Sequence, residues 1–147
     1  MSLRENLEIS MKNALRSGDD VTKRTVRMAL AAIKQTEIDR RIQLDDTGIT
    51  SIIQKEIKTR RESLEEAQQA NRPDLVASCQ AEIEVLKGFL PEEMSESDLL
   101  DLVKAALAES GASSMADMGK VMKLLLPRRQ GRAPNDRVSQ VVRRLLQ

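Results

Sequence analysis

The sequence predicts an all-α protein, and three observations lead to this prediction. Apolar residues recur at steps of three and four along most of the chain, which is the spacing of one helix face. Short stretches with glycine, proline, serine and aspartate separate these periodic segments, as loops between packed helices do. No segment alternates apolar and polar residues in the manner of a strand.

Two helices are expected at the start of the chain. The first begins at Ser2, a good N-cap, and ends at Gly18. The second follows a cap at one of the aspartates in 19–20 and runs to about Ile42. Residues 26–33 are apolar almost all the way round this helix, so we expect it to be central and buried on several sides.

The third and fourth helices are separated by a proline. Thr50 is the expected N-cap of a helix over residues 51–70, and the acidic pair at 45–46 is expected to be solvated in the loop before it. The stretch 71–74, Asn-Arg-Pro-Asp, ends that helix and starts the next one, because proline suits the first helical position. The fourth helix ends at Phe89-Leu90-Pro91.

A domain boundary is expected between Pro91 and Ser95. We therefore predict an N-terminal helical domain over residues 1–91 and a C-terminal three-helix domain over residues 95–147. The helices of the second domain are expected from Ser95 to Ser110, from Met115 to Leu126, and from Pro134 or Asn135 to the end of the chain.

The stretch 111–132 is the strongest candidate for a functional site. Ser114 and Asp117 have the spacing of a capping box that would start a helix. Pro127 is expected to end that helix and to leave residues 128–132 as a flexible basic loop. We predict phosphate contacts from the cations of this stretch and close backbone approach at its glycines: Lys120, Lys123, Arg128, Arg129 and Arg132, with Gly119 and Gly131.

Charge is unevenly distributed along the chain, although the formal total is only +1. From Gly111 onward eight Lys/Arg residues stand against two acids, a net +6, whereas residues 1–110 carry −5. This asymmetry favours a surface that faces a polyanion. A solvated basic face is the plainer alternative.

Composition excludes several kinds of chemistry. The absence of histidine removes an imidazole base and the Ser-His and Cys-His nucleophile pairs. With Cys79 as the one cysteine, an ordinary zinc site within one chain is ruled out, and Cys79 is expected in the core. The six glycines are scattered singly and form no phosphate-binding loop. We expect no catalytic residue, no metal and no cofactor.

Other absences bear on partners and location. Phe89 is the single aromatic residue, so an RNA partner would be recognised through its backbone and shape rather than by stacking of its bases. No apolar run approaches the roughly 18 residues that a membrane span needs, and no signal-peptide pattern opens the chain. We therefore expect a cytoplasmic protein without a membrane partner.

The sequence resembles the GatB/YqeY family over essentially its whole length. The resemblance rests mainly on Asp117-Met118-Gly119-Lys120-Val121-Met122, followed by Pro127 and Gly131-Arg132-Ala133. It also rests on Asn71-Arg72-Pro73-Asp74-Leu75-Val76, Phe89-Leu90-Pro91 and Met94-Ser95-Glu96. Pro134-Asn135-Asp136 departs from the Asp-Gly turn that is common in the family, which leaves the start of the last helix open.

This resemblance implies an N-terminal helical domain followed by a three-helix tail. A similar tail ends the B subunit of glutamine-dependent aspartyl/glutamyl-tRNA amidotransferases, where it contacts the body of the tRNA away from the chemistry. The family is therefore linked to carbon–nitrogen ligase activity with glutamine as amide donor, and to amidotransferase or aminoacyl-tRNA machinery as partners.

Three functions follow as hypotheses. The first is a non-catalytic module that binds tRNA or another structured RNA, accessory to tRNA-dependent amidation. The second is a component of a carbon–nitrogen ligase, although the chain shows no nucleophile or ATP site of its own. The third is a protein–protein adaptor that uses the pliable face of Met115, Met118 and Met122, a face that also suits a helix core.

Overall fold

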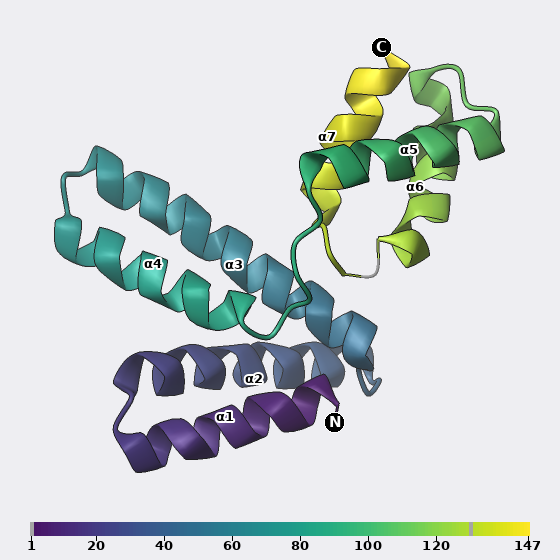
Figure 1. Cartoon of the computed structure of the whole chain (residues 1–147). Helices are drawn as coiled ribbons and strands as arrows, with labels where there is room; N and C mark the ends of the chain where they lie inside the picture. The colour runs from purple at the N-terminus through teal and green to yellow at the C-terminus, as the bar shows by residue number, and fades with distance from the viewer. Residues whose placement is uncertain (1, 130) are drawn as a thin grey trace. The chain divides into compact units, whose positions relative to one another are not determined.

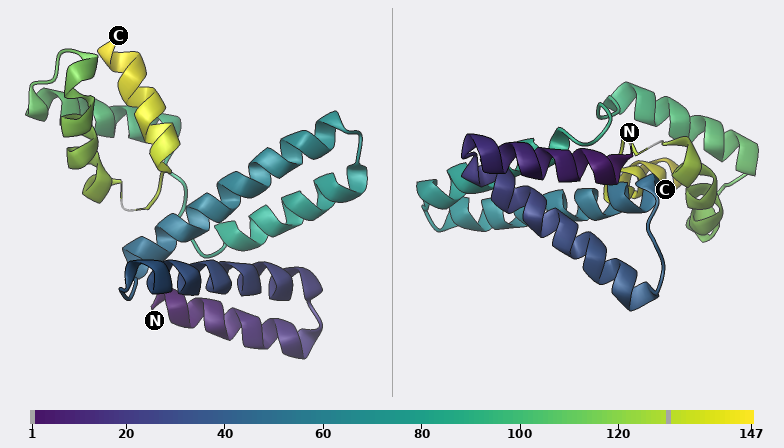
Figure 2. Two further views of the ribbon diagram at one scale, coloured as in Figure 1. Left: turned by 180° about the vertical axis from the view of Figure 1, so that it is seen from behind. Right: turned by 90° about the horizontal axis from the view of Figure 1, so that it is seen from below.

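The protein is all-helical, as the sequence predicts. The computed structural model describes residues 2–129 and 131–147, and over these residues it contains helices and no strand (Figures 1 and 2). The chain forms two compact units that join between Leu90 and Pro91. Each unit has its own apolar core.

The first unit consists of two helical hairpins, in which α1 lies beside α2 and α3 lies beside α4 (Figures 1 and 2). Gly18 ends α1 in the left-handed conformation, with φ of 75°, which glycine adopts without a Cβ clash. The helices are α1 (Leu3–Ser17), α2 (Asp20–Arg40), α3 (Asp46–Gln69) and α4 (Pro73–Lys87).

All four helices contribute to the core of this unit. Leu7, Val26, Ile33, Ile53 and Leu86 are fully buried and belong to one cluster. Burial of each such side chain contributes about 1.5–3 kcal/mol relative to an exposed position. Each helix therefore holds its place mainly through its apolar face.

The start of α3 differs from the prediction. Asp45, not Thr50, is the N-cap: its Oδ1 accepts the backbone N–H of Gly48 at 2.9 Å. Oδ1 of Asp46 accepts the backbone N–H of Leu3 at 3.1 Å, which connects this helix to the first turn of α1. The acidic pair is thus part of the helix start, because carboxylates satisfy free N–H groups and the positive helix end more strongly than a hydroxyl does.

The prediction that the second helix is buried on several sides is also only partly right. Val26, Ala29 and Ile33 are buried against the neighbouring helices. Met28 is 50% exposed and Ile38 is 60% exposed. Some apolar residues of α2 therefore lie on a side of the helix that the other helices of the unit do not cover.

The second unit is a three-helix arrangement with a short 3₁₀ turn before its middle helix (Figure 1). Leu99, Val103, Val121, Leu125 and Val142 are fully buried at its centre. The elements are α5 (Glu96–Ser110), η1 (Met115–Asp117), α6 (Met118–Arg128) and α7 (Asn135–Leu146).

A carboxylate in the first unit joins α1, α2 and the loop before α3. Oε2 of Glu37 accepts a hydrogen bond from Nη2 of Arg4 at 2.6 Å and from the backbone N–H of Leu44 at 2.8 Å. These bonds favour the charged carboxylate, so the Leu44 amide first and then Arg4 hold the pKa of Glu37 below its ordinary value.

We expect Glu37→Gln to lower the stability of the folded chain at neutral pH and to have less effect in acid. A lowered folded-state pKa adds stability above the unfolded pKa of about 4.3, and that stability is lost as the pH falls through the folded value. Urea unfolding midpoints from pH 7 down to pH 3 measure the difference. Glu8→Gln, at an exposed position on α1, is the matched control. A gap between wild type and Glu37→Gln that does not shrink in acid would contradict the prediction.

Candidate nucleic-acid interface

The entry to α6 is built differently from the predicted capping box. The side chain of Ser114 makes no capping bond, and α6 begins only at Met118, after η1. Oδ2 of Asp117 instead accepts the backbone N–H of Ser113 at 3.1 Å. The carboxylate thus satisfies a loop amide behind the helix, and the backbone N–H of Asp117 itself donates to the Ser114 carbonyl.

Pro127 lies inside α6 rather than beyond its end, so the predicted break there is wrong. The helix continues to Arg128, and the N–H of Arg129 donates to the carbonyl of Leu125 at 3.0 Å. Proline removes only its own N–H from the last helical turn, and the next residues still close that turn. Arg128 is consequently fixed to a helix end.

The three arginines that follow Pro127 are each held by a hydrogen bond or an ion pair within the second unit. Nη1 of Arg128 pairs with Oε2 of Glu109 on α5 at 2.5 Å. This hydrogen bond raises the pKa of Arg128 and lowers the pKa of Glu109. Nε of Arg132 donates to the backbone carbonyl of Glu92 at 3.0 Å. The backbone carbonyl of Arg132 accepts the N–H of Met94 at 2.8 Å. Gln130, the middle residue of the predicted loop, lies outside the described residues.

Arg129 is the largest departure from the predicted set of exposed cations. It is only 8% exposed, and its Nη1 donates to the carbonyl of Ala133 at 3.1 Å. Burial lowers the pKa of its guanidinium from the ordinary value. Arg129 therefore packs inside the second unit, where it bridges the end of α6 and the approach to α7.

Three of the predicted residues share the outer side of α6. Gly119, Lys120 and Lys123 are exposed, and both lysine side chains are without a hydrogen-bond or ion-pair partner in the described part of the chain. We call these three residues the α6 face. A Cβ added at Gly119 would meet nothing within 4 Å, so the fold does not require glycine there. Gly131, by contrast, has φ of 71°, a conformation that favours glycine.

Two cations on α7 were not among the predicted contacts. Arg143 and Arg144 are exposed and have no ion-pair or hydrogen-bond partner among the described residues. Their position opposite the buried Val138, Val141 and Val142 was visible as a polar helix side in the sequence. Of the methionines in the adaptor hypothesis, Met118 and Met122 pack against the core of the second unit, whereas Met115 is exposed.

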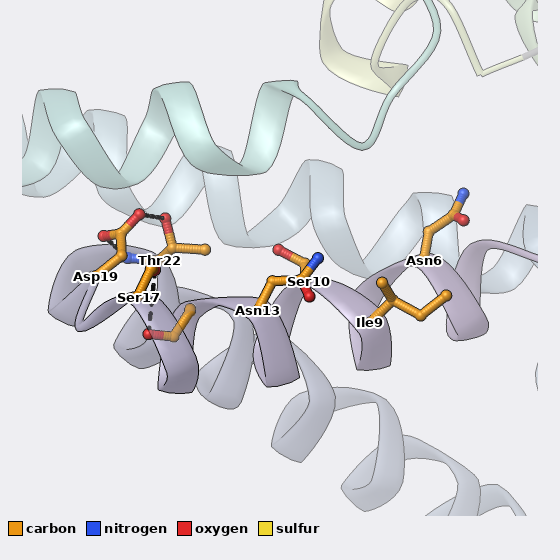
Figure 3. A pocket seen from close by; sticks show the side chains of 8 residues that line it. Asn6, Ile9, Ser10, Asn13, Ser17, Asp19 and Thr22 are labelled. Atoms are coloured by element: carbon orange, nitrogen blue, oxygen red, sulfur yellow. Dashed lines mark hydrogen bonds between the residues drawn. The ribbon is translucent and has the colours of Figure 1, made fainter.

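A shallow hollow of about 340 Å³ runs along α1 to the start of α2 (Figure 3). Asn6, Ser10, Asn13 and Ser17 line it, and Asp19 Oδ2 accepts the hydroxyl of Thr22 at 2.7 Å. Its polar groups are mainly uncharged amides and hydroxyls, which do not make an acid–base pair. Within residues 2–129 and 131–147, no cluster of three metal-ligating side chains occurs, and no helix has the length and apolarity needed to cross a membrane.

The fold and the α6 face define an all-helical protein of two units, with a cationic helix side in the second unit. The chain belongs to the Yqey-like protein family, whose profile matches residues 4–146.

Fungal relatives share a name, "Altered inheritance of mitochondria protein 41, mitochondrial". The one from Pyrenophora tritici-repentis is 37% identical over 121 residues, which cover 79% of this chain and 67% of the relative. The one from Lachancea thermotolerans is 38% identical over 86 residues, which cover 58% of this chain and 46% of the relative. A Saccharomyces cerevisiae relative is 27% identical over 131 residues, with 82% and 71% covered. The match to the Lachancea relative thus spans less than half of that protein's length.

The names of these relatives contradict the prediction of a cytoplasmic protein, because they are mitochondrial proteins by name. The prediction rested on a single cysteine and on the lack of a secretory signal pattern. Neither feature distinguishes the cytoplasm from another reducing compartment.

We expect Arg129→Ala to destabilise the second unit by about 1–3 kcal/mol, because it leaves the buried Ala133 carbonyl without its donor and removes packed side-chain atoms. Urea unfolding monitored by circular dichroism measures this loss. Lys123→Ala, on the exposed α6 face, should stay within about 0.5 kcal/mol of wild type. Equal stability of the two variants would show that Arg129 has no structural role.

Proposed function

We propose that the second unit binds tRNA or another structured RNA through the α6 face, without catalysing a reaction. The observation that carries the proposal is Gly119. An exposed glycine costs about 0.5–1 kcal/mol relative to alanine in a helix interior, and that figure is an upper bound for Gly119, which lies in the first turn of α6. Since a Cβ there would meet nothing, packing within the fold does not explain why glycine occupies this position. Close approach of a binding partner to the helix backbone would explain it, because glycine has no side chain in the way.

The charges beside Gly119 indicate the chemistry of that partner. Lys120 and Lys123 lie three residues apart on α6 and are not neutralised by a carboxylate in the described part of the chain. Two ammonium groups beside an unobstructed helix backbone suit a phosphate chain, which a protein binds by charge and close approach. The near absence of aromatic residues favours recognition of backbone and shape.

The arginines of the neighbouring turn are secondary candidates. Both already make a contact within the second unit: Arg128 pairs with Glu109, and Arg132 donates a hydrogen bond to the Glu92 carbonyl. A guanidinium has five N–H donors, so both retain donors for a phosphate. Arg129 does not belong to the proposed interface, because its side chain is buried.

An accessory role in tRNA-dependent amidation is the wider context that the family resemblance supplies. Under this proposal the chain brings RNA to a carbon–nitrogen ligase formed by other chains. Glutaminase and ATP-dependent amidation assays on the purified chain test the catalytic alternative. Turnover above background would refute the non-catalytic proposal.

We expect Lys120→Ala/Lys123→Ala to weaken tRNA binding and to reduce the magnitude of the log–log salt slope by about two, at roughly 0.9 per phosphate contact. Fluorescence titrations of labelled tRNA from low to moderate salt measure both quantities. Arg143→Ala/Arg144→Ala is the matched control, because it removes two equally exposed cations from α7. An equal loss in both variants would indicate diffuse attraction and would refute a site on α6.

Gly119→Ala separates binding from folding. We expect it to raise the stability of the second unit by up to about 0.5–1 kcal/mol, because alanine is the better helix former. The added methyl group should at the same time lower the affinity for tRNA, since it blocks close approach. Thermal unfolding and the same titration measure the two effects, and a more stable variant with unchanged affinity would remove the main support for the proposal.

A further inference from the structure

The side of α2 that carries Met28 and Ile38 is apolar at regular intervals, and at its start Met28 Sδ also accepts a hydrogen bond from Arg60 Nη2 of α3 at 3.6 Å. Met28, Ala31, Gln35 and Ile38 follow one another at steps of three, four and three, and all four are exposed. We call these residues the outer stripe of α2. Ile42, just past the helix end, is 49% exposed. Single exposed apolar residues are ordinary on protein surfaces, but a row at this spacing is the pattern of a helix that packs against a further helix.

One edge of this side of α2 is cationic. Arg27 and Lys34 flank the outer stripe and are exposed, and their side chains have no ion-pair or hydrogen-bond partner in the described part of the chain. Arg24 pairs with Glu82 of α4, at 3.4 Å between Nε and Oε1. Asp39, the acid on this side, already accepts a hydrogen bond from Gln35 Nε2 at 2.8 Å. The outer stripe is therefore bordered along one edge by two positive charges, Arg27 and Lys34, that the unit does not neutralise.

We propose that the outer stripe of α2 binds an acidic amphipathic helix of another protein. Apolar side chains at steps of three and four on the partner would meet Met28, Ala31 and Ile38. Glutamates or aspartates beside them would meet Arg27 and Lys34. This inference is independent of the RNA proposal, because it concerns the other unit and a different partner chemistry.

Charge complementarity decides between the possible occupants. A second copy of the chain would bring the same unpaired cations to the contact, and like charges in a contact oppose association. A lipid surface suits helices that insert large aromatic and leucine side chains. The outer stripe has no aromatic residue and is interrupted by Gln35. An acidic helix satisfies both the apolar row and its positive border.

The direct test uses the full chain and a fluorescent synthetic peptide of about 18 residues, long enough to form a helix on binding. The peptide carries leucines at steps of three and four and glutamates beside them. A second peptide has lysine in place of every glutamate. We expect the wild-type chain to bind the glutamate peptide and not the lysine peptide, and we expect Met28→Ser/Ile38→Ser to lower that affinity at least about tenfold.

The chain offers matched controls for both parts of the contact. Leu15→Ser, on α1, removes an apolar side chain that is 55% exposed and should leave peptide binding unchanged. Lys34→Glu should weaken binding of the glutamate peptide about two- to fivefold and strengthen binding of the lysine peptide, whereas Lys12→Glu on α1 should do neither. The Met28→Ser/Ile38→Ser chain should bind tRNA as the wild type does.

Several results would overturn the proposal. One is failure of the wild-type chain to prefer the glutamate peptide, and another is an equal loss of binding in Leu15→Ser. A dimer in sedimentation equilibrium that Met28→Ser/Ile38→Ser dissociates would assign the outer stripe to a second copy. Binding to phosphatidylserine vesicles that the same variant abolishes would assign it to a lipid surface.

Discussion

A buried guanidinium stabilises the α6–α7 connection of the second unit. Arg129 donates to the carbonyl of Ala133 and packs inside the unit, so it joins the end of α6 to the approach to α7. Arg132 and Arg137 extend this arrangement: Arg132 donates to the carbonyl of Glu92, and Arg137 Nη1 donates to the carbonyl of Met94 at 2.7 Å. Arginines thus connect residues 92–94 at the start of the unit to the α6–α7 connection and to α7, each through a hydrogen bond to one backbone carbonyl.

This use of arginine divides the cations of the tail into two kinds. Those near the turn hold the fold together, whereas Lys120 and Lys123 on α6 stay free in the described part of the chain. Around the turn and on α6 this division fits the chemistry of the side chains, although Arg143 and Arg144 on α7 also have no partner in the described part of the chain. A planar fork with five donors suits fixed carbonyls and carboxylates, and an ammonium on a flexible stem suits a mobile, solvated contact. A count of positive charges along the sequence therefore overstates the surface that a polyanion meets.

Sequence periodicity predicts which helix faces are buried. It does not predict which of several polar side chains caps a helix or forms a given hydrogen bond. Most apolar stripes of the helices are predicted correctly, because the spacing of apolar residues shows which face of a helix is buried; α2 and the exposed Met115 are exceptions. The sequence analysis misses the start of α3 at Asp45 and the bond from the Ser113 amide to Asp117, because several neighbouring polar side chains can cap a helix and only the fold selects one. The burial of Arg129 is missed for the same reason: its acceptor, Ala133, gains importance only when the turn brings it into position.

The misreading of α2 has a different cause. A helix that is apolar almost all round is expected to be surrounded by its own chain, yet the first unit covers only part of it. The apolar residues of a helix serve contacts within its own chain and contacts with other molecules. In some helices, a folded unit leaves apolar residues exposed at helical spacing and leaves the charges beside them unpaired. Such exposed residues indicate a contact with another molecule. In α2 these exposed apolar residues are Met28, Ala31 and Ile38, with a positive border. The proposed partner is therefore apolar along one face and acidic along its edge.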